Sequence, residues 1–125
     1  SQGAIYFTDP PYGLEKNVDD PLKELPFQGV YHIAPDGKLS LLTKELERPN
    51  GIALSPDGKT LYVANSHPPR PGGVLIFSPE GKHLGTLATG EATSNCTFGE
   101  DGSTLFITAD NYLLRIRLKT KGQGF

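Results

Sequence analysis

The chain has 125 residues, enough for one domain with a buried core, and its formal net charge is −2. Basic residues cluster only near the C-terminal end, so a nucleic-acid partner is not expected. No apolar run reaches membrane-spanning length, so no association with a membrane is expected. The sequence shows no secretory leader pattern and does not indicate a cellular compartment. The single Cys96 excludes an internal disulfide. The absence of methionine predicts a sequence that begins inside a longer gene product or was processed.

Acidic turns recur along the chain at a regular spacing. Asp36, Asp57, Glu80 and Asp101 each precede a glycine, and successive members are 21, 23 and 21 positions apart. Two turns therefore recur every ~44 residues, which is typical of a four-stranded β-propeller blade. Proline and glycine at these turns supply the backbone angles that a hairpin connection requires.

Short apolar or alternating runs between the turns predict about ten β-strands. In chain order these strands cover 4–8, 30–33, 39–43, 52–54, 61–64, 74–77, 83–87, 97–98, 105–108 and 113–118. An exposed loop, rich in Asp, Lys and Pro, is predicted for 17–28, and no stretch has helical periodicity. The fold class is therefore all-β, with about two and a half four-stranded blades.

These strands divide a single partial β-propeller domain, 1–125, into three parts. We expect an incomplete blade in 1–47, one blade in 48–92 and a second incomplete blade in 93–125. A closed ring needs at least about four blades, so the propeller is expected to be open in this chain.

Three sequence motifs, here called words, carry a family resemblance. They are YFTDPPYG at 6–13, RPNG at 48–51 joined to SPDGKTLYV at 55–63, and TSNCTFG at 93–99. The words resemble the gluconolactonase family, which also contains regucalcin and related lactone hydrolases, and the likeness covers nearly the whole chain. It implies a six-bladed propeller that opens a sugar lactone to an aldonic acid with the help of one divalent ion, calcium or zinc.

The resemblance implies three ligands for that ion, of which only one is found in this sequence. Asn50 matches the asparagine of the family's Pro-Asn-Gly word. The family's glutamate is expected upstream of Ser1, and its aspartate is expected near 66–72, where one blade-length of sequence is apparently deleted. Asp57 belongs to an outer turn and is no substitute. No catalytic residue is therefore assigned, and weak metal binding and impaired hydrolysis are expected.

Asp9, Tyr12 and Asn95 are the candidates for substrate binding. Asp9 ends a predicted strand, where it could line the mouth of a cavity or bond to the backbone of its own turn. Tyr12 could face a substrate or pack within its loop. Asn95 heads the strand into Phe98 much as Asn50 heads the strand at 52–54, which suggests a second residue near the axis.

Three interpretations of function stay open. The first is a metal-assisted hydrolase that acts on a small-molecule sugar lactone. The second is a non-catalytic propeller fragment that acts as a binding or self-assembling module, because unpaired sheet edges readily pair with another chain. The third is a shortened gene product without a function of its own.

Overall fold

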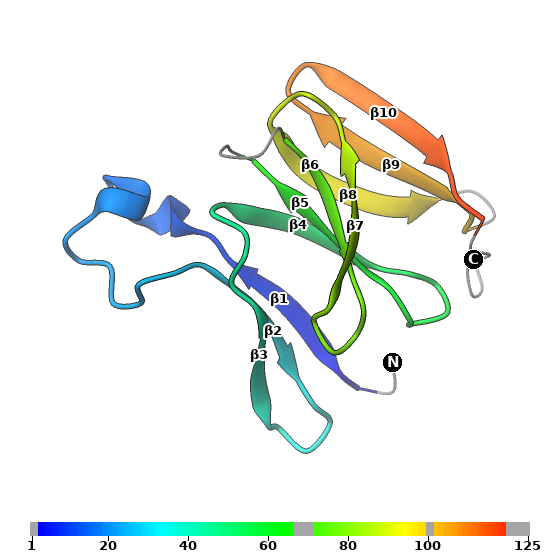
Figure 1. Ribbon diagram of the computed structural model, residues 1–125. Coiled ribbons are helices and arrows are strands. Elements are labelled where there is room, and N and C mark those ends of the chain that lie inside the picture. The colour runs from blue at the N-terminus through cyan, green and yellow to red at the C-terminus, as the bar shows by residue number, and fades with distance from the viewer. Residues whose placement is uncertain (1–2, 67–71, 100–101, 120–125) are drawn as a thin grey trace.

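The computed structural model describes residues 3–66, 72–99 and 102–119 (Figure 1). Its ten strands form three antiparallel sheets, ordered β1-β2-β3, β4-β5-β6-β7 and β10-β9-β8. The strands are β1 (Ile5–Asp9), β2 (Gly29–Ile33), β3 (Leu39–Thr43), β4 (Pro49–Leu54), β5 (Leu61–Asn65), β6 (Gly73–Phe77), β7 (His83–Ala88), β8 (Thr93–Gly99), β9 (Thr104–Ala109) and β10 (Tyr112–Arg117). Two short 3-10 helices, η1 (Pro11–Gly13) and η2 (Asn17–Asp19), lie in the loop after β1.

The predicted all-β class is confirmed, and each predicted strand corresponds to an observed one. The main difference is at the start of two strands. β4 begins at Pro49 and β8 at Thr93, several residues earlier than predicted. Both extensions contain a β-bulge, which lets pairing continue past an extra residue that interrupts the apolar pattern.

The three sheets stack face to face, with β4–β7 in the middle. Alternation along β5 directs Leu61 and Val63 toward the sheet of β1–β3 and Tyr62 toward the sheet of β8–β10, so β5 is buried on both faces. The first core consists of Val30, Leu46, Leu61, Val63, Leu75 and Phe77, and the second of Tyr62, Val74, Cys96, Phe98, Leu105 and Ile107. Each large apolar side chain buried in this way contributes roughly 1.5–3 kcal/mol.

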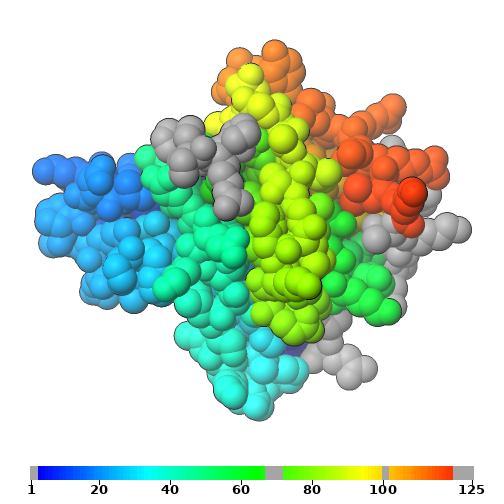
Figure 2. Space-filling view, viewed as in Figure 1, coloured from blue at the N-terminus to red at the C-terminus, as the bar shows by residue number. Residues whose placement is uncertain are grey.

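The outer strands of neighbouring sheets also touch. β3 and β7 lie side by side on the face of the molecule seen in Figure 2. Gly81, just before β7, packs against the backbone carbonyl of Leu42, and a side chain at Gly81 would collide with it. Nearby, His83 Nδ1 lies 3.8 Å from Glu45 Oε2. The first two sheets are therefore in contact from their inner strands to their outer ones.

Both ends of this stack are open in the described part of the chain. Ile5 and Leu39 are exposed on the sheet of β1–β3, and Tyr112 and Leu113 are exposed on β10. No helix among the described residues is long and apolar enough to cross a bilayer.

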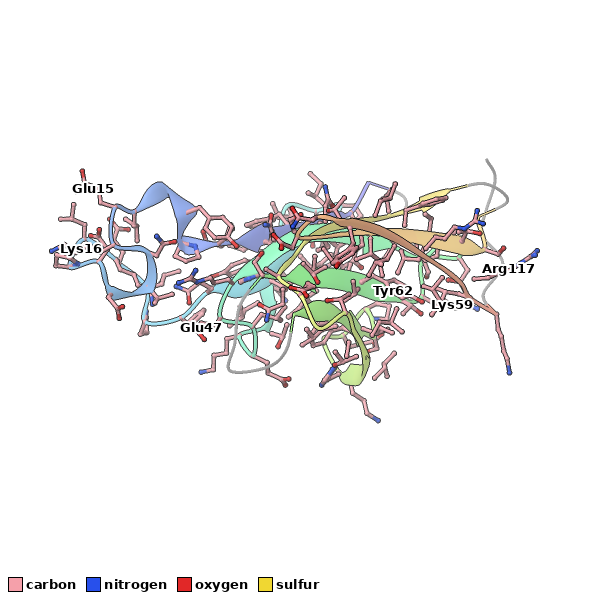
Figure 3. All side chains as sticks on the ribbon, turned by 90° about the horizontal axis from the view of Figure 1, so that it is seen from above. Glu15, Lys16, Glu47, Lys59, Tyr62 and Arg117 are labelled. Atoms are coloured by element: carbon pink, nitrogen blue, oxygen red, sulfur yellow. The ribbon has the colours of Figure 1, made fainter. Side chains whose placement is uncertain are left out.

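The loop between β1 and β2 projects from one end of the molecule. Glu15 and Lys16 mark this end in Figure 3, and Lys59 and Arg117 mark the opposite end. The carboxylate of Asp20 organises the loop, because it accepts hydrogen bonds from the backbone N–H groups of Lys16 and Leu22, each at 2.9 Å.

The Asp20 carboxylate makes the order of this loop dependent on pH. The two backbone hydrogen bonds, first that from Lys16, hold the pKa of Asp20 below its ordinary value of 3.8. The stabilisation is therefore complete above pH 3.8 and is lost as the pH falls through the lowered pKa. We expect the hydrogen-exchange protection factor of the Leu22 amide to fall over that acid range. In Asp20→Asn it should be lower and independent of pH, whereas Asp19→Asn should behave as the unmodified chain.

Candidate functional site

Asn50 lies in a bulge near the start of β4. Pro49 pairs with Asn65 and Ile52 with Val63, so β4 holds one residue more than β5 between these two pairs. A bulge of this kind changes the direction of a side chain relative to the regular alternation of the strand. Asn50 is therefore inside the strand, and not just before it as the sequence predicted, because the bulge accommodates the extra residue.

Two residues bond directly to Asn50, and Ser66 links it to the third sheet. From β1, the hydroxyl of Thr8 donates a hydrogen bond to the backbone oxygen of Asn50 at 2.7 Å. After β5, Ser66 Oγ accepts one from Asn50 Nδ2 at 3.2 Å. Ser66 Oγ in turn donates to the backbone oxygen of Thr93 on β8 at 3.0 Å. The backbone and the side chain of Asn50 are thus held by different sheets, which fixes the residue at the point where the sheets meet.

Asn95, on the neighbouring strand β8, packs against Gly51, the residue that follows Asn50. A Cβ at Gly51 would collide with Asn95 Oδ1 and lie 2.6 Å from Asn95 Cα. A bulge between Thr93 and Asn95 mirrors the bulge in β4. Asn95 Oδ1 accepts a hydrogen bond from the backbone N–H of Cys96 at 2.8 Å. The side chain is exposed and lines a small, mostly apolar groove of about 130 Å³.

Asp9 and Tyr12 lie away from Asn50. Thr8 reaches Asn50 from β1, so the next residue, Asp9, points to the opposite face of that strand. Asp9 lines a hollow of about 410 Å³ together with residues of the loop between β1 and β2, Phe27 among them. Tyr12, in η1, is 44% exposed and is not among the residues that line this hollow.

The charge of Asp9 acts on a tyrosine of the neighbouring strand. Burial, and secondly the carboxylate of Asp9, raise the pKa of Tyr31 above its ordinary value of 10.0. The Tyr31 ring stacks on Phe7 with ring centroids 5.1 Å apart and covers Gly29, where a side chain would collide with the ring. Tyr31 therefore stays neutral at physiological pH. The carboxylate of Asp9 lies near Tyr31 and the loop between β1 and β2, and not near Asn50.

The residues around Asn50 do not fit a divalent ion by themselves. Their oxygen atoms are uncharged amide, hydroxyl and backbone groups, whereas calcium takes about 6–8 oxygen ligands that normally include carboxylates. No group of three or more His, Cys, Asp or Glu gathers in the described parts of the chain. Asp57 bonds within its own turn, to Ser55 Oγ at 2.6 Å and the N–H of Lys59 at 3.0 Å. Of the region 66–72, where an aspartate ligand and a deletion were predicted, positions 67–71 lie outside the described residues.

Arg48 adds a cationic group two residues before Asn50. Its backbone N–H donates to Asn65 Oδ1 at 3.2 Å, and its backbone oxygen accepts from the N–H of Ser66 at 3.1 Å. The Nε atom of Arg48 is buried and has no hydrogen-bond acceptor within the described residues. A buried donor of this kind is costly unless an acceptor reaches it.

Cys96 is a core residue and is poorly suited to act as a nucleophile. It is 3% exposed, its Sγ lies 3.7 Å from the backbone oxygen of Tyr62, and burial raises its pKa to about 12. Because only the thiolate reacts readily, we expect negligible alkylation of the native chain by iodoacetamide at pH 7.5 and rapid alkylation in urea. A Cys96→Ala/Thr97→Cys variant, with its thiol at an exposed position of the same strand, should react without urea. Rapid labelling of native Cys96 would contradict this assignment.

Sequence reasoning missed the residues that hold Asn50. Thr8 and Thr93 lie 42 and 43 positions away in the chain, and although both belong to the stretches that carry the family resemblance, nothing local indicates that they lie near Asn50. Ser66 had a usable signal, because the hairpin turn at 55–59 brings the end of β5 beside the start of β4, where Pro49 pairs with Asn65 and Ser66 follows. The local Pro-Asn-Gly motif identified Asn50, whereas the packing of strands far apart in the chain determines which residues contact it.

Comparison with known proteins identifies the family. The family described as SMP-30/Gluconolactonase/LRE-like region matches residues 1–71. A gluconolactonase from Zymomonas mobilis subsp. mobilis is 36% identical over 173 positions, covering 96% of this chain and 49% of the relative. That match is 48 positions longer than the chain of 125 residues, so the relative has residues inside the match that this chain lacks.

Two solved structures are similar to this chain to different degrees of sequence identity and structural overlap. A gluconolactonase from Xanthomonas campestris is 30% identical with a TM-score of 0.42, covering 92% of this chain and 53% of that one. A chain of the nidogen/laminin complex has a TM-score of 0.65 at 18% identity, covering 94% of this chain and 40% of that one. The second likeness concerns the fold alone. The family predicted from the sequence is confirmed: the chain belongs to the SMP-30/gluconolactonase/LRE-like family and spans about half the length of the curated relative that it matches.

Proposed function

We propose that the residues around Asn50 form part of the substrate site of a sugar-lactone hydrolase. The observation that carries this proposal is that Thr8 and Ser66 both bond to Asn50, while Ser66 also bonds to Thr93 of the third sheet. Family membership supports the reaction class, because gluconolactonases are among the relatives. The substrate we propose is a small-molecule sugar lactone, whose hydroxyl groups suit an uncharged site of amides and hydroxyls.

In this proposal the described residues bind and orient the lactone. Asn50 and Asn95 offer amide groups to ring hydroxyls, while Thr8 keeps the backbone of Asn50 in place. Hydrolysis also requires a group that accepts a proton from the attacking water. No carboxylate contacts Asn50 among the described residues, so this chain by itself should bind a lactone better than it hydrolyses one. The divalent ion that the family resemblance implies is not supported by this uncharged donor set.

A pH-indicator assay with D-glucono-1,5-lactone tests the proposal. We expect a small protein-dependent rate above spontaneous hydrolysis, lost in Asn50→Ala and retained in Asn111→Ala, which changes an exposed asparagine in a turn. Addition of calcium or zinc should raise the rate little, because the donor set is neutral. Equal rates for the unmodified chain and Asn50→Ala would overturn the role of Asn50.

The architecture that accompanies this function is a partial six-bladed β-propeller. Its support is the face-to-face stacking of three sheets that are open at both ends. The residues that the gluconolactonase relative has inside the match support the expectation that this chain lacks a segment, which the sequence predicts near 66–72.

A second candidate function is self-association of this chain. It is favoured by the apolar side chains exposed on both outer sheet faces, among them Leu39 at 58% and Leu113 at 72%. Light scattering over a concentration series should then detect a dimer or larger species that Leu113→Lys weakens. A monodisperse monomer at all concentrations would count against this candidate and leave the lactonase proposal unaffected.

A further inference from the structure

The amide group of Asn50 can face the ligand with either its oxygen or its nitrogen, and the two orientations have opposite chemistry. The oxygen accepts hydrogen bonds, and the nitrogen donates them. An amide that is free to rotate would offer a mixture of both. What determines the behaviour of the site is therefore the group that selects one orientation.

Ser66 makes this selection because its only proton is already used. Ser66 Oγ donates to the backbone oxygen of Thr93 at 3.0 Å, and a backbone oxygen can only accept. Toward Asn50, at 3.2 Å, Ser66 Oγ must therefore act as an acceptor. The group of Asn50 that it meets has to be the nitrogen, since a flipped amide would place two acceptors against each other.

The far end of this arrangement is anchored in buried structure. Thr93 is 0% exposed, and its hydroxyl lies 2.8 Å from that of Thr89. The backbone oxygens of Gly72, at 2.7 Å, and Glu91, at 2.8 Å, are the acceptors within reach of the Thr89 hydroxyl. The carbonyl that takes the proton of Ser66 thus belongs to a buried residue held by a second hydroxyl.

The consequence is that Asn50 presents its oxygen on the side away from Ser66. Asn50 is partly exposed, and its Oδ1 accepts no hydrogen bond from any described residue. We propose that Ser66 is a positioning residue that keeps Asn50 Oδ1 turned toward the ligand, so that the site selects uncharged ligands whose hydroxyl groups donate to this oxygen. This inference rests on the proposed function and adds the residue that sets the preference of the site for hydroxyl donors.

The test uses the whole chain, labelled with 15N, and D-glucitol, a stable neutral polyol, as the probe. The side-chain NH₂ signals of Asn50 are assigned from their absence in Asn50→Ala. In the absence of ligand, Ser66→Ala should shift these signals and remove their protection from exchange, whereas Ser66→Thr, which keeps the hydroxyl, should retain both. Backbone amide spectra of the variants report whether each one is folded.

Titration with D-glucitol in EDTA then measures the effect on binding. We expect Asn50 signals to shift with ligand, an affinity about fivefold lower in Ser66→Ala, and recovery to within about twofold in Ser66→Thr. Unchanged NH₂ signals in Ser66→Ala would overturn the positioning role. No response of the unmodified chain to D-glucitol would overturn the ligand class. Loss of lactone hydrolysis with intact NH₂ signals would instead be a failure of the proposed function alone.

Discussion

Replacement of Phe77 by alanine is expected to lower the free energy of unfolding by about 3–5 kcal/mol. Phe77 is 0% exposed, belongs to the core between the first two sheets, and lies 5.2 Å from the His83 ring between centroids. Truncation of a buried phenylalanine costs about 3–5 kcal/mol through lost burial and the cavity left behind. A domain of this size has only about 5–15 kcal/mol of stability, so one such cavity removes a large part of it.

Urea unfolding followed by circular dichroism measures this effect. Leu84→Ala is the matched control, because Leu84 lies on the next strand of the same sheet but is 55% exposed. The control should change the free energy of unfolding by no more than about 0.5 kcal/mol. Similar midpoints for the two variants would mean that the contact between the first two sheets contributes little to stability.

Gly51→Ala is expected to disturb the candidate site and the stability together. The new Cβ would collide with Asn95 Oδ1 and lie 2.6 Å from Asn95 Cα, a distance that real Cβ atoms essentially never show. Because Asn95 Cα is a backbone atom, β8 has to move away from β4. Overpacking of this kind costs about 1–3 kcal/mol. The side-chain amide signals of Asn50 and Asn95 should both shift.

Gly85→Ala provides the control for this prediction. A Cβ at Gly85 meets nothing within 4 Å, and Gly85 also lies in a strand. Its unfolding midpoint should stay the same or rise slightly, since alanine reduces the freedom of the unfolded chain. If Gly51→Ala were as stable as Gly85→Ala and left both asparagine signals in place, the close approach of β4 and β8 would be wrong.

The three substitutions test three different properties: the packing of the sheets, the approach of two strands and the chemistry of the site. Phe77 tests whether stacked sheets supply the stability, and Gly51 tests whether two inner strands approach closely enough to bring Asn50 and Asn95 together. Ser66 tests the chemistry of the site itself. A chain that passes the first two tests and fails the third would have the described architecture with a different use for Asn50.

The sequence by itself determined the strands, the turns and the family. Proline and glycine at fixed positions of turns such as 55–59 act within a few residues, and alternation of apolar residues marks strands such as β10. These signals are local, so they can be found without knowing what packs against what. The Pro-Asn-Gly word that contains Asn50 is local in the same sense.

Only the tertiary structure decided which residues these motifs contact and which of their side chains are buried. β5 is buried on both faces because sheets pack on each side of it, and Asn50 gains Thr8 and Ser66 as partners because distant strands converge there. Asp9, in spite of its place in a family word, faces the loop side of its strand and not Asn50. Such outcomes depend on contacts between residues far apart in the chain, and on bulges that reverse the direction of a side chain, neither of which has a local pattern.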